Sequence, residues 1–141
     1  MKKLIIIGIC SCILPVASAS IEWKKPVEEA NVADLIENSF KKGNADQLAI
    51  LLADELELMI DSEKVNFNKI SKEHASFILS SFFKKNPPVR FTYVYKGITA
   101  DKLKYSVANY QTPNKEFMIY MLINETKSGS VEIKTLQFRE N

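Results

Sequence analysis

The sequence predicts one α+β domain in which helices pack against one face of a bent antiparallel sheet. Two observations carry this prediction. Helical periodicity and one short hairpin occupy the first half of the chain, and four strand candidates joined by turn-rich connectors occupy the second half. Helices that precede a run of strands, rather than alternate with them, are typical of α+β architecture. No internal repeat or low-complexity segment divides the 141 residues, so we expect one folded domain.

The chain begins with a segment typical of an export signal. Lys2 and Lys3 precede an apolar run at residues 4–14, and Ala17-Ser18-Ala19 forms a small-residue cleavage site. The run is shorter than the roughly 20 apolar residues that span a bilayer. We therefore expect residues 1–19 to be a signal peptide, and the mature protein to be periplasmic or secreted with no membrane anchor.

Both cysteines, Cys10 and Cys12, lie in this leader. Lipid attachment at Cys12 is the alternative to cleavage after Ala19; after cleavage there, no disulfide or thiolate metal site is expected. Lys2 and Lys3 account for two of the 19 basic residues, so 17 remain against 17 acidic ones. A chain without net charge lacks the basic surface typical of nucleic-acid binders, so we expect no nucleic-acid partner.

The first elements are expected to be an arm and two helices. Residues 20–30 show no clear period and are expected to form an N-terminal arm, with Trp23 either docked on the domain or exposed for recognition. A helix is expected from Asn31 to Gly43, because a glycine can take the left-handed conformation that ends a helix. Asn44 and Gln47 then fit the capping box of a second helix. The apolar stripe of the first helix recurs at spacings of three and four: Val32, Leu35, Ile36, Ser39 and Phe40.

A hairpin and a third helix follow. Leucine and isoleucine alternate with glutamate and methionine at residues 55–60, which predicts a half-buried strand, and residues 65–67 form a short return strand. Ser71 is expected to cap a helix that runs to Lys85, because the two prolines after Asn86 prevent it from continuing. The stripe expected to face the core contains Ala75, Ile78, Leu79 and Phe82.

Four strands are expected at residues 89–96, 105–112, 116–125 and 131–138. In the first of them, Phe91, Tyr93 and Tyr95 alternate with Arg90 and Thr92, which is typical of an antiparallel strand with one side on the core. We expect the aromatic side chains to line the inside of the fold. A platform on which bases or sugars stack is the alternative.

The strand at residues 117–123 is apolar on both faces. Since helices can cover only one face, we expect a second layer on the other, formed by a partner subunit or by the arm. Leu136 and Phe138 would extend the open face into a patch larger than monomers usually expose. We therefore expect a homodimer through the sheet face, since two-fold dimers are the commonest homo-oligomers.

Residues 71–97, SKEHASFILSSFFKKNPPVRFTYVYKG, resemble a family of small exported bacterial proteins of unknown function. KGNADQLAILL is similar to its second-helix entry, and FMIYMLI and LQFRE resemble its last two strands. The family is placed in the nuclear-transport-factor-like, ketosteroid-isomerase-like superfamily, the cystatin-like cone. The resemblance implies, for residues 31–141, a curved antiparallel sheet wrapped around N-terminal helices with a pocket at the open end. It carries over no catalytic residues.

The candidate chemistry is sparse. A proton-shuttling enzyme in such a cone needs a carboxylate or histidine base beside an oxyanion donor. The strands expected to line the cone contain tyrosines but no Asp, Glu or His. His74, the only histidine, lies at the margin of its helix stripe, and Asp34 lies near the edge of another. No metal-ligand spacing or glycine-rich phosphate loop occurs, so neither a metal nor a cofactor is expected.

We therefore expect an exported, non-catalytic domain that binds a small apolar or amphipathic ligand, or a protein partner, through the cone pocket or the sheet face. One alternative is an isomerase- or hydratase-like enzyme that uses pocket tyrosines with His74 or Asp34. Another is a structural homodimer whose cone is filled by its own side chains. The side chains expected at the pocket wall are Phe91, Tyr93, Tyr95, Tyr110, Tyr120 and His74.

Overall fold

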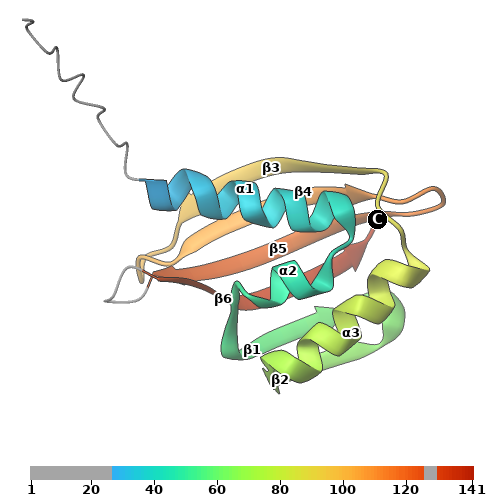
Figure 1. Cartoon of the computed structure of the whole chain (residues 1–141), viewed down its shortest axis with the longest axis horizontal. Helices are drawn as coiled ribbons and strands as arrows, with labels where there is room; N and C mark the ends of the chain where they lie inside the picture. Colours follow the sequence, from blue (N-terminus) through green and yellow to red (C-terminus); the bar gives the residue numbers. More distant parts are fainter. Residues whose placement is uncertain (1–26, 126–129) are drawn as a thin grey trace, which may run out of the picture.

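The computed structural model describes residues 27–125 and 130–141. The expected signal peptide, Cys12 and Trp23 lie outside these residues. Within them the helices come first and most of the strands follow, as an α+β fold requires (Figure 1). The elements in chain order are α1 (Val27–Lys42), α2 (Ala45–Ala49), β1 (Leu52–Ile60), the short 3₁₀ helix η1 (Asp61–Glu63), β2 (Val65–Ser71), α3 (Lys72–Lys85), β3 (Arg90–Ile98), β4 (Lys104–Gln111), β5 (Glu116–Glu125) and β6 (Val131–Glu140).

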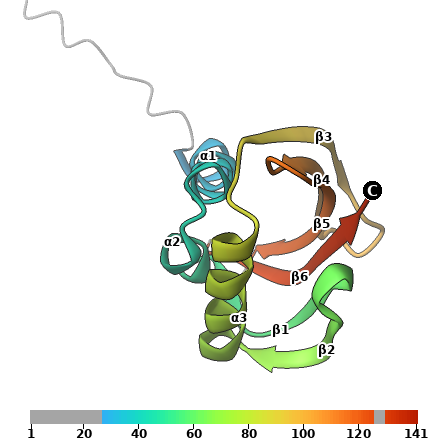
Figure 2. The same ribbon diagram turned by 90° about the vertical axis from the view of Figure 1, so that its right-hand side faces the viewer.

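The strands of the described residues form one six-stranded sheet in the order β2-β1-β6-β5-β4-β3. Neighbours run antiparallel except β1 and β6, which are parallel. The sheet is therefore mixed, where the sequence predicted antiparallel pairing throughout. Figure 2 shows the sheet curling from β3 round to β2, with all three helices on its concave side. The predicted cone of a curved sheet around N-terminal helices is confirmed.

Local sequence signals fix the helix ends. α1 begins at Val27 rather than Asn31, so it includes the last residues of the expected arm. It ends before Gly43, whose φ of +60° favours glycine. The side chain of Asn44 accepts a hydrogen bond from the Gln47 amide at 3.1 Å, which confirms the cap of α2.

The cap of α3 is confirmed in the same way. The Ser71 hydroxyl accepts a hydrogen bond from the His74 amide at 3.3 Å. On the core stripe of α3, Ala75, Leu79 and Phe82 are buried as expected, and the adjacent Phe83 is buried with them. The two neighbouring phenylalanines therefore both pack inward at the end of the helix.

A group of buried aromatic rings fills the concave face where α1 and α3 end. The ring of Phe40 stacks on Phe91, with centroids 4.9 Å apart and planes at 4°, and meets Phe83 edge-on at 5.8 Å. From α3, the ring of Phe82 lies 4.6 Å from Phe138. We call this group the aromatic cluster: Phe40, Phe82, Phe83, Phe91, Tyr110, Phe117 and Phe138, none more than 5% exposed. The aromatic cluster therefore fills the concave face at the end of the cone where α1 and α3 end.

The junction between α3 and β3 holds the end of α1 in place. The backbone N–H and the side-chain amide of Asn86 both donate to the Phe82 carbonyl, at 2.9 and 3.2 Å, and close the end of α3. The Asn86 carbonyl accepts a hydrogen bond from the Tyr110 hydroxyl at 2.5 Å. A Cβ atom added to Gly43 would lie only 3.2 Å from Cδ of Pro88. Gly43 belongs to the segment KGNAD and Pro88 to the segment KNPP, so two segments that carry the family resemblance lie against each other here.

We expect Gly43→Ala to lower the free energy of unfolding by at least about 1 kcal/mol. The left-handed conformation costs a residue with a Cβ roughly this much, and the Pro88 ring must also move. Urea unfolding at neutral pH measures the loss. Gly97→Ala is the matched control, because the new Cβ would meet only the ring end of Tyr95, which is 57% exposed and able to swing away. Equal losses in both variants would count against the contact with Pro88 as the cause.

Candidate functional site

A β-bulge in β3 decides which side chains face the inside of the cone. Tyr93 pairs with Ala108 of β4 and Tyr95 pairs with Val107, so Val94 is an extra residue in β3. A bulge reverses the alternation of the residues that follow it. Phe91 and Tyr93 keep their expected inward direction, but Tyr95 faces outward and is 57% exposed. The prediction that these three aromatic residues share one face is therefore wrong at Tyr95.

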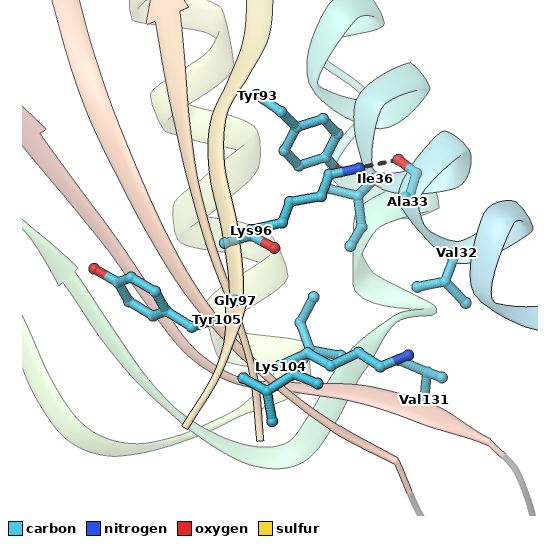
Figure 3. A pocket seen from close by; sticks show the side chains of 12 residues that line it. Val32, Ala33, Ile36, Tyr93, Lys96, Gly97, Lys104, Tyr105 and Val131 are labelled. Atoms are coloured by element: carbon cyan, nitrogen blue, oxygen red, sulfur yellow. Dashed lines mark hydrogen bonds between the residues drawn. The ribbon is translucent and has the colours of Figure 1, made fainter. Parts of the chain in front are cut away.

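A cavity of about 410 Å³ lies at the open end of the cone, between the first half of α1 and the sheet (Figure 3). Apolar side chains make up most of its wall, and two lysines and Ser106 supply the polar groups apart from Tyr93. The ring of Tyr105 points away from the other labelled side chains, as the pairing of its strand requires. The lining residues are Val32, Ala33, Ile36, Tyr93, Lys96, Gly97, Ile98, Lys104, Tyr105, Ser106, Ile123 and Val131.

Tyr93 ties the sheet to α1 at the cavity wall. Its hydroxyl donates a hydrogen bond to the carbonyl of Ala33 at 3.0 Å. Burial raises the pKa of Tyr93 well above its usual value, and the carboxylates of Glu37 and Asp34 raise it further. The phenol therefore stays neutral and remains a hydrogen-bond donor. The ammonium of Lys96 lies over this ring, 4.2 Å from its centroid.

The other expected wall residues lie elsewhere. Phe91 and Tyr110 are buried in the aromatic cluster, and burial raises the pKa of Tyr110, whose hydroxyl is bonded to Asn86. Tyr120 faces outward with the guanidinium of Arg139 5.5 Å above its ring, because Ile119 and Met121 take the inward positions of β5. His74 is exposed on α3, with its ring 6.0 Å from Phe67. Of the six expected residues, only Tyr93 lines this cavity.

Sequence reasoning missed three polar residues of the cavity wall: Lys96, Lys104 and Ser106. Lys96 faces inward only because of the bulge, and nothing in the run FTYVYK marks Val94 as an extra residue. Ser106 is 7% exposed, and its partners across the sheet are Lys96 and Met121. A small polar residue between apolar neighbours is the one signal that could have indicated a gap in the packing.

The outer face of the sheet is less apolar than the sequence predicted. Met118, Tyr120 and Leu122 do face outward on β5 and are half-buried. Leu136 and Phe138 face the core and are 0% exposed, so the expectation that they extend the outer patch is wrong. Leu136 lies opposite Met121 and Phe138 lies opposite Ile119, and both of these β5 residues are buried on the inner face, so their partners share that face. Pairing of two copies through this face stays a prediction.

The described part of the cavity wall supplies hydrogen-bond donors but no carboxylate and no imidazole. Among the described residues that line it, none is Asp, Glu or His. Asp34 is exposed on α1, and Glu37 is paired with Lys41 at 2.5 Å. The described residues bring together no group of three or more histidine, cysteine or carboxylate side chains suited to a metal ion. No helix within residues 27–125 or 130–141 is long and apolar enough to cross a membrane.

We expect Tyr93→Phe to change the pH dependence of stability. Tyr93 keeps its proton to a higher pH in the folded protein than in the unfolded chain, where tyrosine titrates near 10.0. The retained proton therefore adds to the free energy of unfolding below the pH at which the unfolded tyrosine titrates, and this contribution is lost as the pH rises above that value. At neutral pH the variant should be less stable by about 0.5–1.5 kcal/mol, for the lost hydrogen bond. This deficit should be constant below about pH 10 and should shrink as the pH rises above it, because there the unfolded chain releases a proton that the folded protein keeps.

Urea unfolding at a series of pH values measures this difference. Tyr120→Phe is the matched control, since its ring lies on the outer face, and it should leave the unfolding free energy close to that of the unmutated protein. A deficit in Tyr93→Phe that stays constant over the whole alkaline range would contradict the buried position of the phenol.

A family model described as "Domain of unknown function (DUF4783)" matches residues 33–139. Among solved structures, a DUF4783 family protein from Bacteroides fragilis is 20% identical, with a TM-score of 0.68 over 76% of this chain and 96% of that chain. One from Bacteroides uniformis is 20% identical, with a TM-score of 0.69 over 79% and 98%. An NTF-2 like protein of unknown function from Silicibacter pomeroyi is 9% identical, with a TM-score of 0.60 over 82% and 94%. A search of the curated proteins finds no match. At such identities these structures bear on the fold alone, and they confirm the nuclear-transport-factor-like cone.

Proposed function

The chain belongs to the DUF4783 family, a family of unknown function, and we propose that it is a binding protein that holds a small apolar or amphipathic ligand at the open end of the cone. The observation that carries this proposal is the cavity of about 410 Å³ between α1 and the sheet. Ligand sites in proteins are concave, mostly apolar and commonly about 300–1,000 Å³ in volume, with a few polar groups that orient the ligand. The cavity has this size and this composition.

The contrast between the two ends of the cone supports a binding site. At the closed end the aromatic cluster fills the concave face. At the open end the facing positions carry small residues, Ala33 on α1 and Ser106 on β4. A domain whose cone served only as a core would gain stability by filling this space, because empty volume costs dispersion contacts. A filled cone is therefore the weaker account of this chain.

The polar groups favour binding over catalysis. The Tyr93 hydroxyl already donates to the Ala33 carbonyl and keeps its proton. A general base would have to come from His74, which is exposed on α3 away from the cavity, or from Asp34, which is exposed on α1. General acid–base catalysis needs the base within hydrogen-bond reach of the reacting atom. The isomerase- or hydratase-like alternative lacks such a base among the described residues of the wall.

Binding of a neutral fluorescent dye tests the proposal. N-phenyl-1-naphthylamine brightens in apolar sites, and we expect it to bind the protein in the cavity. Ser106→Phe places a ring in this space, and it should weaken binding by about tenfold or more, since each 1.4 kcal/mol of lost contact is a factor of ten. Ala33→Leu adds bulk from the helix side and should act in the same direction.

Val94→Phe is the matched control for added aromatic bulk. Val94 is 60% exposed at the bulge and does not line the cavity, so this variant should bind the dye like the unmutated protein. Circular dichroism and thermal unfolding check that each variant is folded. Dye binding that is unaffected by folded Ser106→Phe and Ala33→Leu proteins would place the dye elsewhere and refute the proposed site.

A further inference from the structure

The charged side chains on the cavity wall are all positive. Among the described lining residues, Lys96 from β3 and Lys104 from β4 are the charged ones. Two carboxylates of α1, Glu37 and Asp34, do not line the cavity, although their charges act on the Tyr93 phenol. Glu37 is also paired with Lys41 at 2.5 Å, and Asp34 is exposed to solvent. Among the described residues, the charged side chains that line the cavity are therefore cationic, although the chain as a whole is close to neutral.

Lys96 is an exposed residue, and two features direct its side chain to this wall. The bulge at Val94 turns its side chain to the concave face, opposite Ser106. The ammonium then lies over the ring of Tyr93, 4.2 Å from the centroid, where the negative face of the aromatic ring attracts it. Figure 3 shows its aliphatic stem running along the cavity toward α1. An ammonium has three N–H donors, and the ring contact fixes its position without using any oxygen acceptor.

Ser106 adds a second donor at the same place. It is 7% exposed and lies on the inner face of β4. Its hydroxyl is not among the buried side-chain oxygens that lack a partner, and as a residue of the cavity wall it can donate to a ligand oxygen there.

We propose that the ligand of this cavity is an amphipathic anion. Its head, a carboxylate or a phosphate, is bound by the Lys96 ammonium and the Ser106 hydroxyl, and its apolar part packs against Val32, Ile36 and Ile123. This inference rests on the proposed binding function and names its ligand class. Hydrogen bonds between ionised partners are shorter and stronger than neutral ones. A neutral or cationic head of the same size lacks these contacts.

Displacement of bound N-phenyl-1-naphthylamine by amphiphiles of one chain length tests the ligand class. We expect decanoate to displace the dye at a concentration about tenfold or more below that needed for decanol, and decylamine to be the weakest of the three. Decyl phosphate, measured beside decanoate, tells a phosphate head from a carboxylate head. Equal potency of decanoate and decanol would overturn the proposal.

Substitution of Lys96 tests the residue. Lys96→Met keeps most of the length of the side chain and removes the charge, so it should weaken binding of decanoate by about tenfold and leave that of decanol unchanged. Lys96→Arg keeps the charge and should retain most of the preference for decanoate. Lys69→Met is the matched control, because Lys69 is a strand lysine on β2, at the opposite edge of the sheet from β3. The Lys69→Met protein should bind decanoate and decanol as the unmutated protein does.

The two proposals fail in different ways. If the dye binds and Ser106→Phe abolishes its binding, but Lys96→Met leaves the ratio of decanoate to decanol unchanged, the binding function stands and the anionic ligand is refuted. If the unmutated protein binds no dye and neither amphiphile, the proposed function is contradicted, and the ligand class with it.

Discussion

The contact between the end of α1 and the α3–β3 junction holds the two halves of this fold together. Gly43 takes a left-handed conformation that brings the chain against Pro88, and one turn earlier Phe40 stacks on Phe91. Asn86 closes the end of α3, and its carbonyl accepts the hydroxyl of Tyr110. Burial of the aromatic cluster around this point supplies hydrophobic stabilisation and dispersion contacts. α1 is thereby fixed at its carboxyl end against β3, β4 and α3 together.

The cavity follows from fixing α1 at that end. Its first half extends along the sheet away from that end (Figure 1), and the cavity lies there, with Ala33 and Ser106 among its lining residues. The hydrogen bond from Tyr93 to the Ala33 carbonyl sets the separation of helix and sheet there. The bulge in β3 then adds chemistry to this space, because it moves Tyr95 out and brings Lys96 in. One extra residue in a strand thus places Lys96 beside Tyr93 at the wall and moves Tyr95 away from it.

Local signals were enough to predict much of the fold. Asn44 and Ser71 cap helices because their side chains bond amides within three residues, and such contacts depend on nearby sequence alone. The alternation of β1 predicted its faces for the same reason. The parallel pairing of β1 with β6 joins residues far apart in the chain, and periodicity in either strand carries no information about its partner.

The candidate site was harder to predict, because single-residue shifts decide it. Alternation placed Tyr95 inward and left Lys96 outward, and the bulge at Val94 reversed both. For Tyr120, Leu136 and Phe138 the strand period was read correctly, but which of the two faces meets the helices depends on tertiary packing. Tyr93 was placed at the wall correctly, since it precedes the bulge.

Native mass spectrometry of the protein purified from its own host, without detergent, tests the central claim most directly. The claim is that the open end of the cone is a binding site rather than unfilled core. Under non-denaturing conditions we expect the polypeptide to carry an adduct of roughly a few hundred daltons, as suits a cavity of this size, and to lose it on denaturation. A spectrum with only the mass of the bare polypeptide, or of bare multiples of it, would contradict the claim.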